Sequence, residues 1–315
     1  MTGLVALTGA TGFVGSAIAR QLSAAGWRVR ALVRRMPSSA LLAGHSLEIV
    51  LGDLDNRESL GHLLQGCDAI VHGAGLVRAL KPLDFFKVNE GGTQQILEAA
   101  AEHAPRARFL QVSSLAAREP QLSAYAGSKH AAEQKVAALA GERPWIALRP
   151  PAVYGPGDVE LLPLFQAAKL GLIAYPAAAG ARVSTIHVDD LATGVATILA
   201  ASDWSTRIVE IDDEHPRGHD WPEILTALGT AFGRRPTSVR LPRSAMTPIA
   251  AVVGLISQLR KQPQVLSAEK VAELYHPNWV AAGPRLSELV RWEPLFSLEK
   301  GFADTARWYR SRSLL

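Results

Sequence analysis

The stretch Leu4-Val5-Ala6-Leu7-Thr8-Gly9-Ala10-Thr11-Gly12-Phe13-Val14-Gly15 decides the fold. An apolar strand pattern runs into glycines spaced G-x-x-G-x-x-G, and an amphipathic helix pattern follows at 13–25. Small loop residues let the backbone approach a pyrophosphate, and the helix N-terminus offers free N–H groups and a positive dipole end. In this strand-loop-helix context the pattern predicts a dinucleotide site. Its predicted residues are Gly9, Thr11, Gly12, Phe13, Val14 and Gly15.

The first half of the chain alternates short apolar runs with helical patterns. Strands are predicted at 4–8, 28–33, 47–51, 69–72, 109–112 and 145–148, and helices at 13–25, 57–64, 85–103 and 125–139. This alternation is typical of βαβ units, in which helices cover both faces of a parallel sheet. We therefore predict an α/β fold of the Rossmann type, with a doubly wound parallel sheet.

The rhythm changes after Arg149-Pro150-Pro151, where glycine and proline interrupt residues 154–158. We predict a dinucleotide-binding domain at 1–154 and a smaller mixed α/β lobe at 155–315 that mainly binds substrate. Within 183–212, two strand patterns at 186–188 and 207–211 are expected to return to the first sheet.

Composition limits the classes of function. The chain has 315 residues, of which 48% are hydrophobic, and a formal charge of +4. The basic residues are scattered, so we expect no nucleic-acid partner. Cys67 is the single cysteine, which excludes an intrachain disulfide, fits a reducing compartment and predicts a buried small residue. With no leader pattern at the N-terminus, a cytoplasmic enzyme is expected.

The longest apolar run, 246–259, is shorter than the ~20 residues that span a bilayer. Arg243, Arg260 and Lys261 flank it. The simpler interpretation is a helix packed on the second lobe. Peripheral membrane contact through 246–261 is the alternative.

The end of the second predicted strand indicates which dinucleotide binds. NAD sites usually carry an acidic residue there that binds the ribose 2′-hydroxyl. This chain has Arg34 and Arg35 and no carboxylate. Because arginines form charge-assisted bonds to a 2′-phosphate, NADP(H) is predicted and NAD(H) is less favoured. The alternative is a pair of plain surface arginines.

Two further segments are predicted to contact the cofactor. Asp53 and Leu54 follow the third strand, where a carboxylate can reach the adenine edge. Capping of the helix at 56–64 is an equal alternative for Asp53. Ala74 and Gly75 follow the fourth strand, and their small size would let the ribose and pyrophosphate lie against the backbone.

A hydroxyl, a phenol and an amine form the candidate catalytic group. Ser114 ends the strand at 109–112, and Tyr125 and Lys129 share one helix face at i,i+4 spacing. A free phenol has a pKa near ~10, and a neighbouring ammonium together with an oxidised nicotinamide is expected to lower it by about three units. Tyr125 would give a proton to a carbonyl oxygen as hydride reaches the carbon, while Ser114 holds that oxygen.

With these residues in place, the chain resembles the extended short-chain dehydrogenase/reductase family over nearly its whole length. The resemblance implies that Ser114, Tyr125 and Lys129 are catalytic, and that Tyr125 and Lys129 also contact the cofactor. It implies that Pro150 to Val153 line the nicotinamide side. It also implies a small-molecule substrate bound mainly after residue 155, and a homodimer formed through the helices at 85–103 and 125–139.

Departures from particular branches narrow the choice. The dehydratase branch typically has Thr-Asp-Glu where this chain has Ser114-Leu115-Ala116. Sugar-nucleotide epimerases commonly carry an Arg-Asp-aromatic run where this chain has Val183-Ser184-Thr185, with Arg182 out of step by one. The segments 31–34 and 154–158 look like the dihydroflavonol-reductase and 3β-hydroxysteroid-dehydrogenase-like branch.

Three hypotheses follow. The first is an NADP(H)-dependent oxidoreductase acting on a carbonyl or secondary alcohol of a moderately apolar molecule. The second is a nucleoside-diphosphate-sugar epimerase. The third is a non-catalytic cofactor-binding or assembly protein.

Other candidate positions can also be explained by purely structural roles. His187 could contact substrate, but a capped histidine at a strand end is favoured. The Asp189-Asp190 pair could indicate metal or acid chemistry, but a helix N-cap is favoured. No His/Cys cluster has ligand spacing, so no metal is expected. An apolar substrate wall, with the protein core as the alternative, could comprise Leu76, Val77, Leu161, Phe165, Ile173 and Tyr175.

Overall fold

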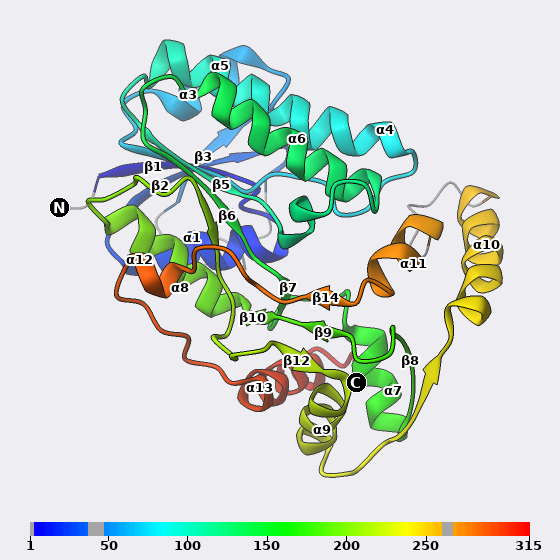
Figure 1. Ribbon diagram of the computed structural model, residues 1–315. Helices are drawn as coiled ribbons and strands as arrows, with labels where there is room; N and C mark the ends of the chain where they lie inside the picture. Colours follow the sequence, from blue (N-terminus) through cyan, green and yellow to red (C-terminus); the bar gives the residue numbers. More distant parts are fainter. Residues whose placement is uncertain (1–2, 37–46, 260–266) are drawn as a thin grey trace.

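The computed structural model describes residues 3–36, 47–259 and 267–315, and a seven-stranded sheet lies at its centre (Figure 1). All neighbouring strands in this sheet are parallel, in the order β11-β6-β5-β4-β1-β2-β3. The predicted doubly wound α/β fold is confirmed. The strands are β1 (Leu4–Thr8), β2 (Arg28–Val33), β3 (Leu47–Leu51), β4 (Ala69–His72), β5 (Arg108–Val112), β6 (Trp145–Arg149) and β11 (Ile208–Glu210).

Helices cover both faces of the sheet, which is why β1 and β4 are buried along their full length. On one face, α1 (Phe13–Ala24) packs against α8 (Val188–Ala200). The other face carries α3 (Arg57–Leu64), α5 (Gly92–His103) and α6 (Ala124–Leu139) (Figure 1). Each layer forms its own apolar core against the sheet.

The strand order reverses between β1 and β4. At such a switch point, the loops that leave neighbouring strands diverge and open a crevice at the carboxyl ends of the strands. Gly9 follows β1 and Gly73 follows β4 at this place. The crevice therefore lies beside the predicted phosphate loop.

The helix predicted at 85–103 is present as a helical run, but it is not α-helical throughout. A short helix α4 (Pro82–Phe85) passes into a π-helical segment η1 (Phe86–Gly91), and α5 begins at Gly92. Asn89, in the π-helical segment, turns inward and bonds the backbone of Leu76. A π-helical turn re-aims one side chain in this way, and it is frequent at functional sites.

Of the two strands expected to return, one does so. β11 pairs with β6 at the edge of the main sheet. β10 (Thr185–His187) instead pairs with β7 (Ala152–Tyr154) in a separate two-stranded sheet, so this part of the prediction is wrong.

The C-terminal region builds a third core from aromatic side chains. Phe302 lies 5.0 Å from Tyr154 and 5.2 Å from Phe165, measured between ring centroids. Phe165 and Ile173 are fully buried in this core, so they do not form the substrate wall that the sequence allowed. The elements are η2 (Leu115–Arg118), α7 (Leu162–Leu170), β8 (Leu172–Pro176), β9 (Arg182–Val183), β12 (His219–Asp220), α9 (Trp221–Phe232), β13 (Thr237–Leu241), β14 (Asn278–Trp279), α12 (Leu286–Leu289) and α13 (Leu298–Ser311).

The apolar run forms α10 (Arg243–Leu259), which packs with α11 (Ala268–Leu274) at the edge of the molecule (Figure 1). Their shared core is small and consists of Met246, Ala250 and Val271, with Leu241 and Tyr275 against it. The flanking residues 260 and 261 lie outside the described residues. Over the described ranges, no helix combines the length and apolarity needed to cross a bilayer.

Candidate active site

The phosphate loop has the close backbone approach that its glycines predict. Gly9 has a φ of +79°, and a Cβ there would lie 2.7 Å from backbone atoms of Gly73 and Ala74. A Cβ at Gly15 would lie 2.0 Å from the Gly9 oxygen. Side chains at either position would therefore force the loop open.

The start of α1 has the features of an anion site. Gly12 is the N-cap residue, no side chain caps the helix, and the first turn holds no acidic residue. Thr11 and Gly12 are exposed, and Phe13 and Val14 are partly buried beside them. The free N–H groups and dipole suit a diphosphate, so these residues fit the predicted dinucleotide.

Arg34 and Arg35 leave the carboxyl end of β2 with exposed side chains. Neither guanidinium makes a hydrogen bond or ion pair with another residue in the described ranges. Both therefore have their donors available beside the crevice. Their predicted role toward a 2′-phosphate remains a prediction.

At the end of β3, the capping alternative for Asp53 is wrong. Asn56 is the N-cap of α3, and its Oδ1 accepts from Ser59 N at 2.9 Å. The Asp53 side chain is exposed and does not cap α3. Leu54 packs against Gly92, where a Cβ would lie 2.8 Å from Leu54 Cδ1.

The turn after β4 is fixed by polar side chains. Thr8 Oγ1 lies 2.8 Å from His72 Nδ1 and accepts from Ala74 N at 3.2 Å. A Cβ at Gly75 would lie 2.9 Å from Asn89 Oδ1. Ala74 and Gly75 thus keep the backbone at the edge of the crevice, as their small size predicts.

Ser114 and Tyr125 meet in the structure. Ser114 follows β5 and Tyr125 stands in the first turn of α6, where the phenol lies near enough to the Ser114 hydroxyl for that group to act on its pKa. The Phe85 ring packs edge-on against the Tyr125 ring at 6.0 Å. The residues predicted to share one carbonyl oxygen therefore lie side by side.

Lys129 lies one turn further along α6 and is 9% exposed. Its Nζ donates to the Val112 carbonyl at 2.7 Å, and it reaches the neighbourhood of Gly75. Burial lowers the pKa of Lys129 to about 8, although the Glu133 charge opposes this.

Without a bound cofactor the Tyr125 phenol is not acidic, and the lower pKa expected beside an oxidised nicotinamide stays a prediction. Burial raises the pKa of Tyr125 to about 12; the Ser114 hydrogen bond opposes the shift and the Glu273 charge adds to it. Desolvation disfavours a phenolate more strongly than this hydrogen bond favours it. Tyr125 is consequently protonated at neutral pH and can act as an acid.

A buried ion pair connects the strand β6 to the catalytic helix α6. Arg149 Nε and Nη2 bind Glu133 Oε1 at 2.9 Å and Oε2 at 2.6 Å, and Ser113 Oγ also donates to Glu133. This bidentate geometry holds the end of β6 against α6. Pro150 follows that strand, and its carbonyl accepts from Leu115 N at 2.8 Å, next to Ser114. Val153, three residues on, is partly buried in β7.

Two carboxylates that the sequence analysis missed hold the start of α6. Ser123, the N-cap, donates to Glu273 Oε1, and Ala124 N donates to Glu269 Oε2 at 3.0 Å. Both glutamates belong to α11, almost 150 residues away in sequence. No local spacing links them to Tyr125, so only the tertiary fold reveals them.

His187 and the aspartates after it serve the fold. His187 is fully buried and is the N-cap of α8, with Nδ1 accepting from Asp189 N at 3.3 Å. The predicted N-cap at Asp189-Asp190 is therefore wrong. Asp190 instead accepts from the backbone N–H groups of Leu295 and Phe296, because its side chain points away from the helix start.

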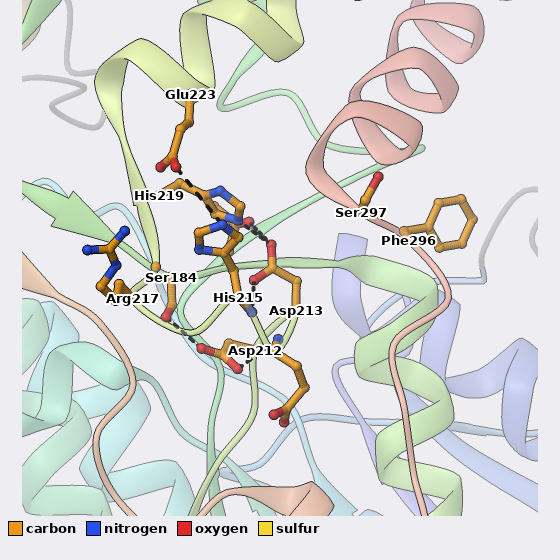
Figure 2. Close-up of polar contacts among 12 residues, drawn as sticks. Ser184, Asp212, Asp213, His215, Arg217, His219, Glu223, Phe296 and Ser297 are labelled. Carbon is orange, nitrogen blue, oxygen red and sulfur yellow. Dashed lines mark hydrogen bonds and ion pairs between the residues drawn. The ribbon is translucent and has the colours of Figure 1, made fainter.

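Three residues at four-residue spacing, His215, His219 and Glu223, bring ligand-type atoms together. His215, His219 and Glu223 place these atoms within 4.8 Å of one another (Figure 2). They already take part in polar contacts: His219 Nε2 lies 2.6 Å from Asp213 Oδ2, and Glu223 Oε2 binds Arg182 at 3.1 Å. The structure thus brings together a cluster that the sequence analysis missed, and the expected absence of a metal stays a prediction.

Comparison with known proteins assigns the family. Residues 5–211 match the model of the NAD dependent epimerase/dehydratase family. The chain belongs to this family. The resemblance to extended short-chain dehydrogenases/reductases is confirmed, and a chain of this family is an NAD(P)-dependent enzyme of the reductase or epimerase type.

Family members similar to the chain over most of its length include three curated relatives. A ceramide reductase of Caulobacter vibrioides is 38% identical over 99% of this chain and 96% of the relative. A putative dihydroflavonol 4-reductase of Synechocystis is 28% identical over 97% and 94%. A 3β-hydroxysteroid dehydrogenase/Δ5→4-isomerase of Mycobacterium tuberculosis is 28% identical over 98% and 91%.

Solved structures of other proteins share the fold. The crystal structure of gox2253 has a TM-score of 0.79 at 24% identity and covers 100% of this chain and 99% of that one. MoeE5, solved with UDP-glucose and NAD, has a TM-score of 0.73 at 22% identity, with full coverage of both chains.

Proposed function

We propose that this enzyme uses NADPH to reduce a carbonyl group of an apolar, lipid-like molecule of the ceramide type. The observation that carries the proposal is the position of the Tyr125 phenol beside the Ser114 hydroxyl, with Lys129 one helical turn away. The 38% identity to a ceramide reductase over nearly both chains supports the substrate class.

The chain's own residues account for proton transfer. Ser114 orients the carbonyl oxygen through its hydroxyl, and Tyr125 donates its proton to that oxygen. The Lys129 ammonium, one helical turn from Tyr125, would stabilise the phenolate that remains in this partly dry site. A reduced nicotinamide, when bound, supplies the hydride that the carbonyl carbon accepts.

Cofactor choice follows from the end of β2. Arg34 and Arg35 offer unpaired guanidinium donors, which match a phosphate better than a ribose hydroxyl. The loop formed by Gly9, Gly12 and Gly15 would hold the diphosphate against the start of α1.

Arg182 argues against the epimerase alternative. Its guanidinium binds Asp220 at 3.2 Å and Glu223 at 3.1 Å, and it also donates to two backbone carbonyls. An arginine engaged in this way is not free to hold a sugar-nucleotide diphosphate.

The test is a substrate panel with the purified enzyme and NADPH. Ketone analogues of ceramide, a dihydroflavonol, a keto-steroid and UDP- and GDP-sugars are compared by loss of nicotinamide absorbance and by product analysis. We expect reduction of the ceramide-type ketone with the highest kcat/KM. Conversion of the nucleotide sugars alone, or no turnover of any ketone, would refute the proposal.

A further inference from the structure

The described part of α10 presents apolar side chains to solvent. Ile249 is 46% exposed and Val252 is 58% exposed, while Met246 and Ala250 of the same helix are buried in the core shared with α11. An apolar face of this kind on a helix at the edge of a molecule marks an interaction surface.

The surroundings of this face are positively charged. The described residues 234–259 contain four basic residues and no Asp or Glu. Arg235, Arg240 and Arg243 are exposed, and none of the three forms an ion pair with a carboxylate of the described ranges. Exposed apolar residues next to unpaired arginines suit an anionic lipid surface.

A second apolar rim lies across the catalytic helix. Val77, Leu80 and Leu83 are 64%, 48% and 77% exposed. Leu83 belongs to α4, which contacts α6 and also carries Phe85 against the Tyr125 ring.

Both sets of exposed apolar residues, on α10 and at Val77, Leu80 and Leu83, belong to segments connected to the start of α6, where Tyr125 lies. α11, which packs on α10, holds the start of α6 through Glu269 and Glu273. In Figure 1, α4 and α10 both stand on the right-hand side, with α11 between α10 and the body of the molecule. The start of α6, which carries Tyr125, therefore contacts both α4 and α11.

We propose that α10 and the rim of Leu80 and Leu83 rest on an anionic bilayer, and that the apolar substrate passes from the bilayer to Tyr125 between them. The substrate part rests on the proposed function, whereas the docking does not. A second copy of the chain fits this face less well, because a two-fold interface would set the arginines of one copy against those of the other.

The direct test is co-sedimentation of the full-length protein with vesicles of phosphatidylcholine, with and without phosphatidylglycerol. We expect binding to the anionic vesicles that weakens as salt rises, and little binding to phosphatidylcholine alone. No binding to anionic vesicles at low salt would overturn the proposal.

Three variants locate the surface. The double changes Ile249→Ser/Val252→Ser and Arg240→Gln/Arg243→Gln should each lower vesicle affinity about tenfold or more. The control Leu295→Ser removes a side chain that is 72% exposed in the loop before α13 and should leave affinity unchanged. Thermal melting and NADPH affinity verify that each variant is folded. Equal effects in all three, or a lower oligomeric state of the Ile249/Val252 variant by light scattering, would contradict docking through α10.

Kinetics separate the docking from the proposed reaction. With a short-chain, water-soluble ketone, the Ile249/Val252 variant should keep its kcat/KM. With a long-chain ketone in anionic vesicles, it should lose about tenfold, in line with its affinity loss. Vesicle binding without reduction of any ketone would refute the proposed reaction and leave the docking supported.

Discussion

At the scale of single residues, burial and hydrogen bonding set the proton chemistry of Tyr125. The phenol is protonated because burial raises its pKa to about 12, and Ser114 orients it. Lys129 lies so deep that its own pKa falls to about 8. The Tyr125 phenol therefore holds a proton that it can donate. The Lys129 amine is mostly charged only below about pH 8.

The charge of Lys129 predicts the pH dependence of reduction. Below its pKa of about 8 the ammonium stabilises the forming phenolate, and above it this stabilisation disappears. We expect kcat/KM to stay constant as the pH is lowered from neutrality, and to fall as the pH is raised above about 8. Lys129→Met should have low activity without this alkaline limb. A wild-type profile that stays flat through pH ~10 would contradict the role of Lys129.

Arg34 should determine cofactor preference. Arg34→Ala is expected to weaken NADPH binding about 10- to 100-fold, the equivalent of one or two charge-assisted hydrogen bonds, and to change NADH binding little. Arg28→Ala, at the opposite end of β2 and also exposed, is the matched control. Calorimetric titration of both cofactors measures the effect. Equal loss for NADPH and NADH would defeat the assignment.

At the scale of elements, the sequence pattern predicts those helices and strands whose ends are set by neighbouring residues. β1 to β4 and α3 have the predicted bounds because their apolar runs and turn residues act over a few positions. The π-helical break at 86–91 is missed because it depends on Asn89 reaching Leu76, a contact made only in the folded chain. Likewise, Ser114, Tyr125 and Lys129 could be chosen from spacing, but Glu269 and Glu273 could not.

The start of α6 should affect catalysis more than stability alone explains. Ser123→Ala removes the N-cap and the bond to Glu273, and is expected to cost about 1 kcal/mol of unfolding free energy. It should also lower kcat, because Tyr125 lies two residues after the cap. Ser297→Ala removes the cap of α13 and should cost a similar unfolding free energy without changing kcat. Urea melts and steady-state kinetics on both variants test this. Equal kcat values would show that the cap does not position Tyr125.

At the scale of the whole molecule, the C-terminal region joins the sheet at the catalytic edge. Arg118, just after Ser114, donates to the carbonyls of Val280 and Asn278. Glu273 adds its bond to Ser123 nearby. The C-terminal elements are thus tied to the segments that carry Ser114 and Tyr125, and pairings this distant in sequence lie beyond what periodicity predicts.

Among these long-range contacts, those of Asp190 should contribute strongly to the free energy of unfolding. It is fully buried and accepts two backbone hydrogen bonds, from Leu295 and Phe296. Asp190→Ala leaves both donors without their partner and is expected to cost about 2–4 kcal/mol of unfolding free energy. Asp189→Ala removes only an exposed ion pair to Arg20 and should cost less than about 1 kcal/mol. Urea denaturation compares them, and equal losses would contradict this account.

The most direct test of the central claim is Tyr125→Phe. Single-turnover reduction and NADPH affinity are measured on the same preparation. We predict that the rate of ketone reduction falls about 100-fold or more, the contribution of a positioned acid, while the NADPH dissociation constant changes less than about threefold. A variant that reduces the ketone as fast as the wild type would contradict the assignment of Tyr125 as proton donor.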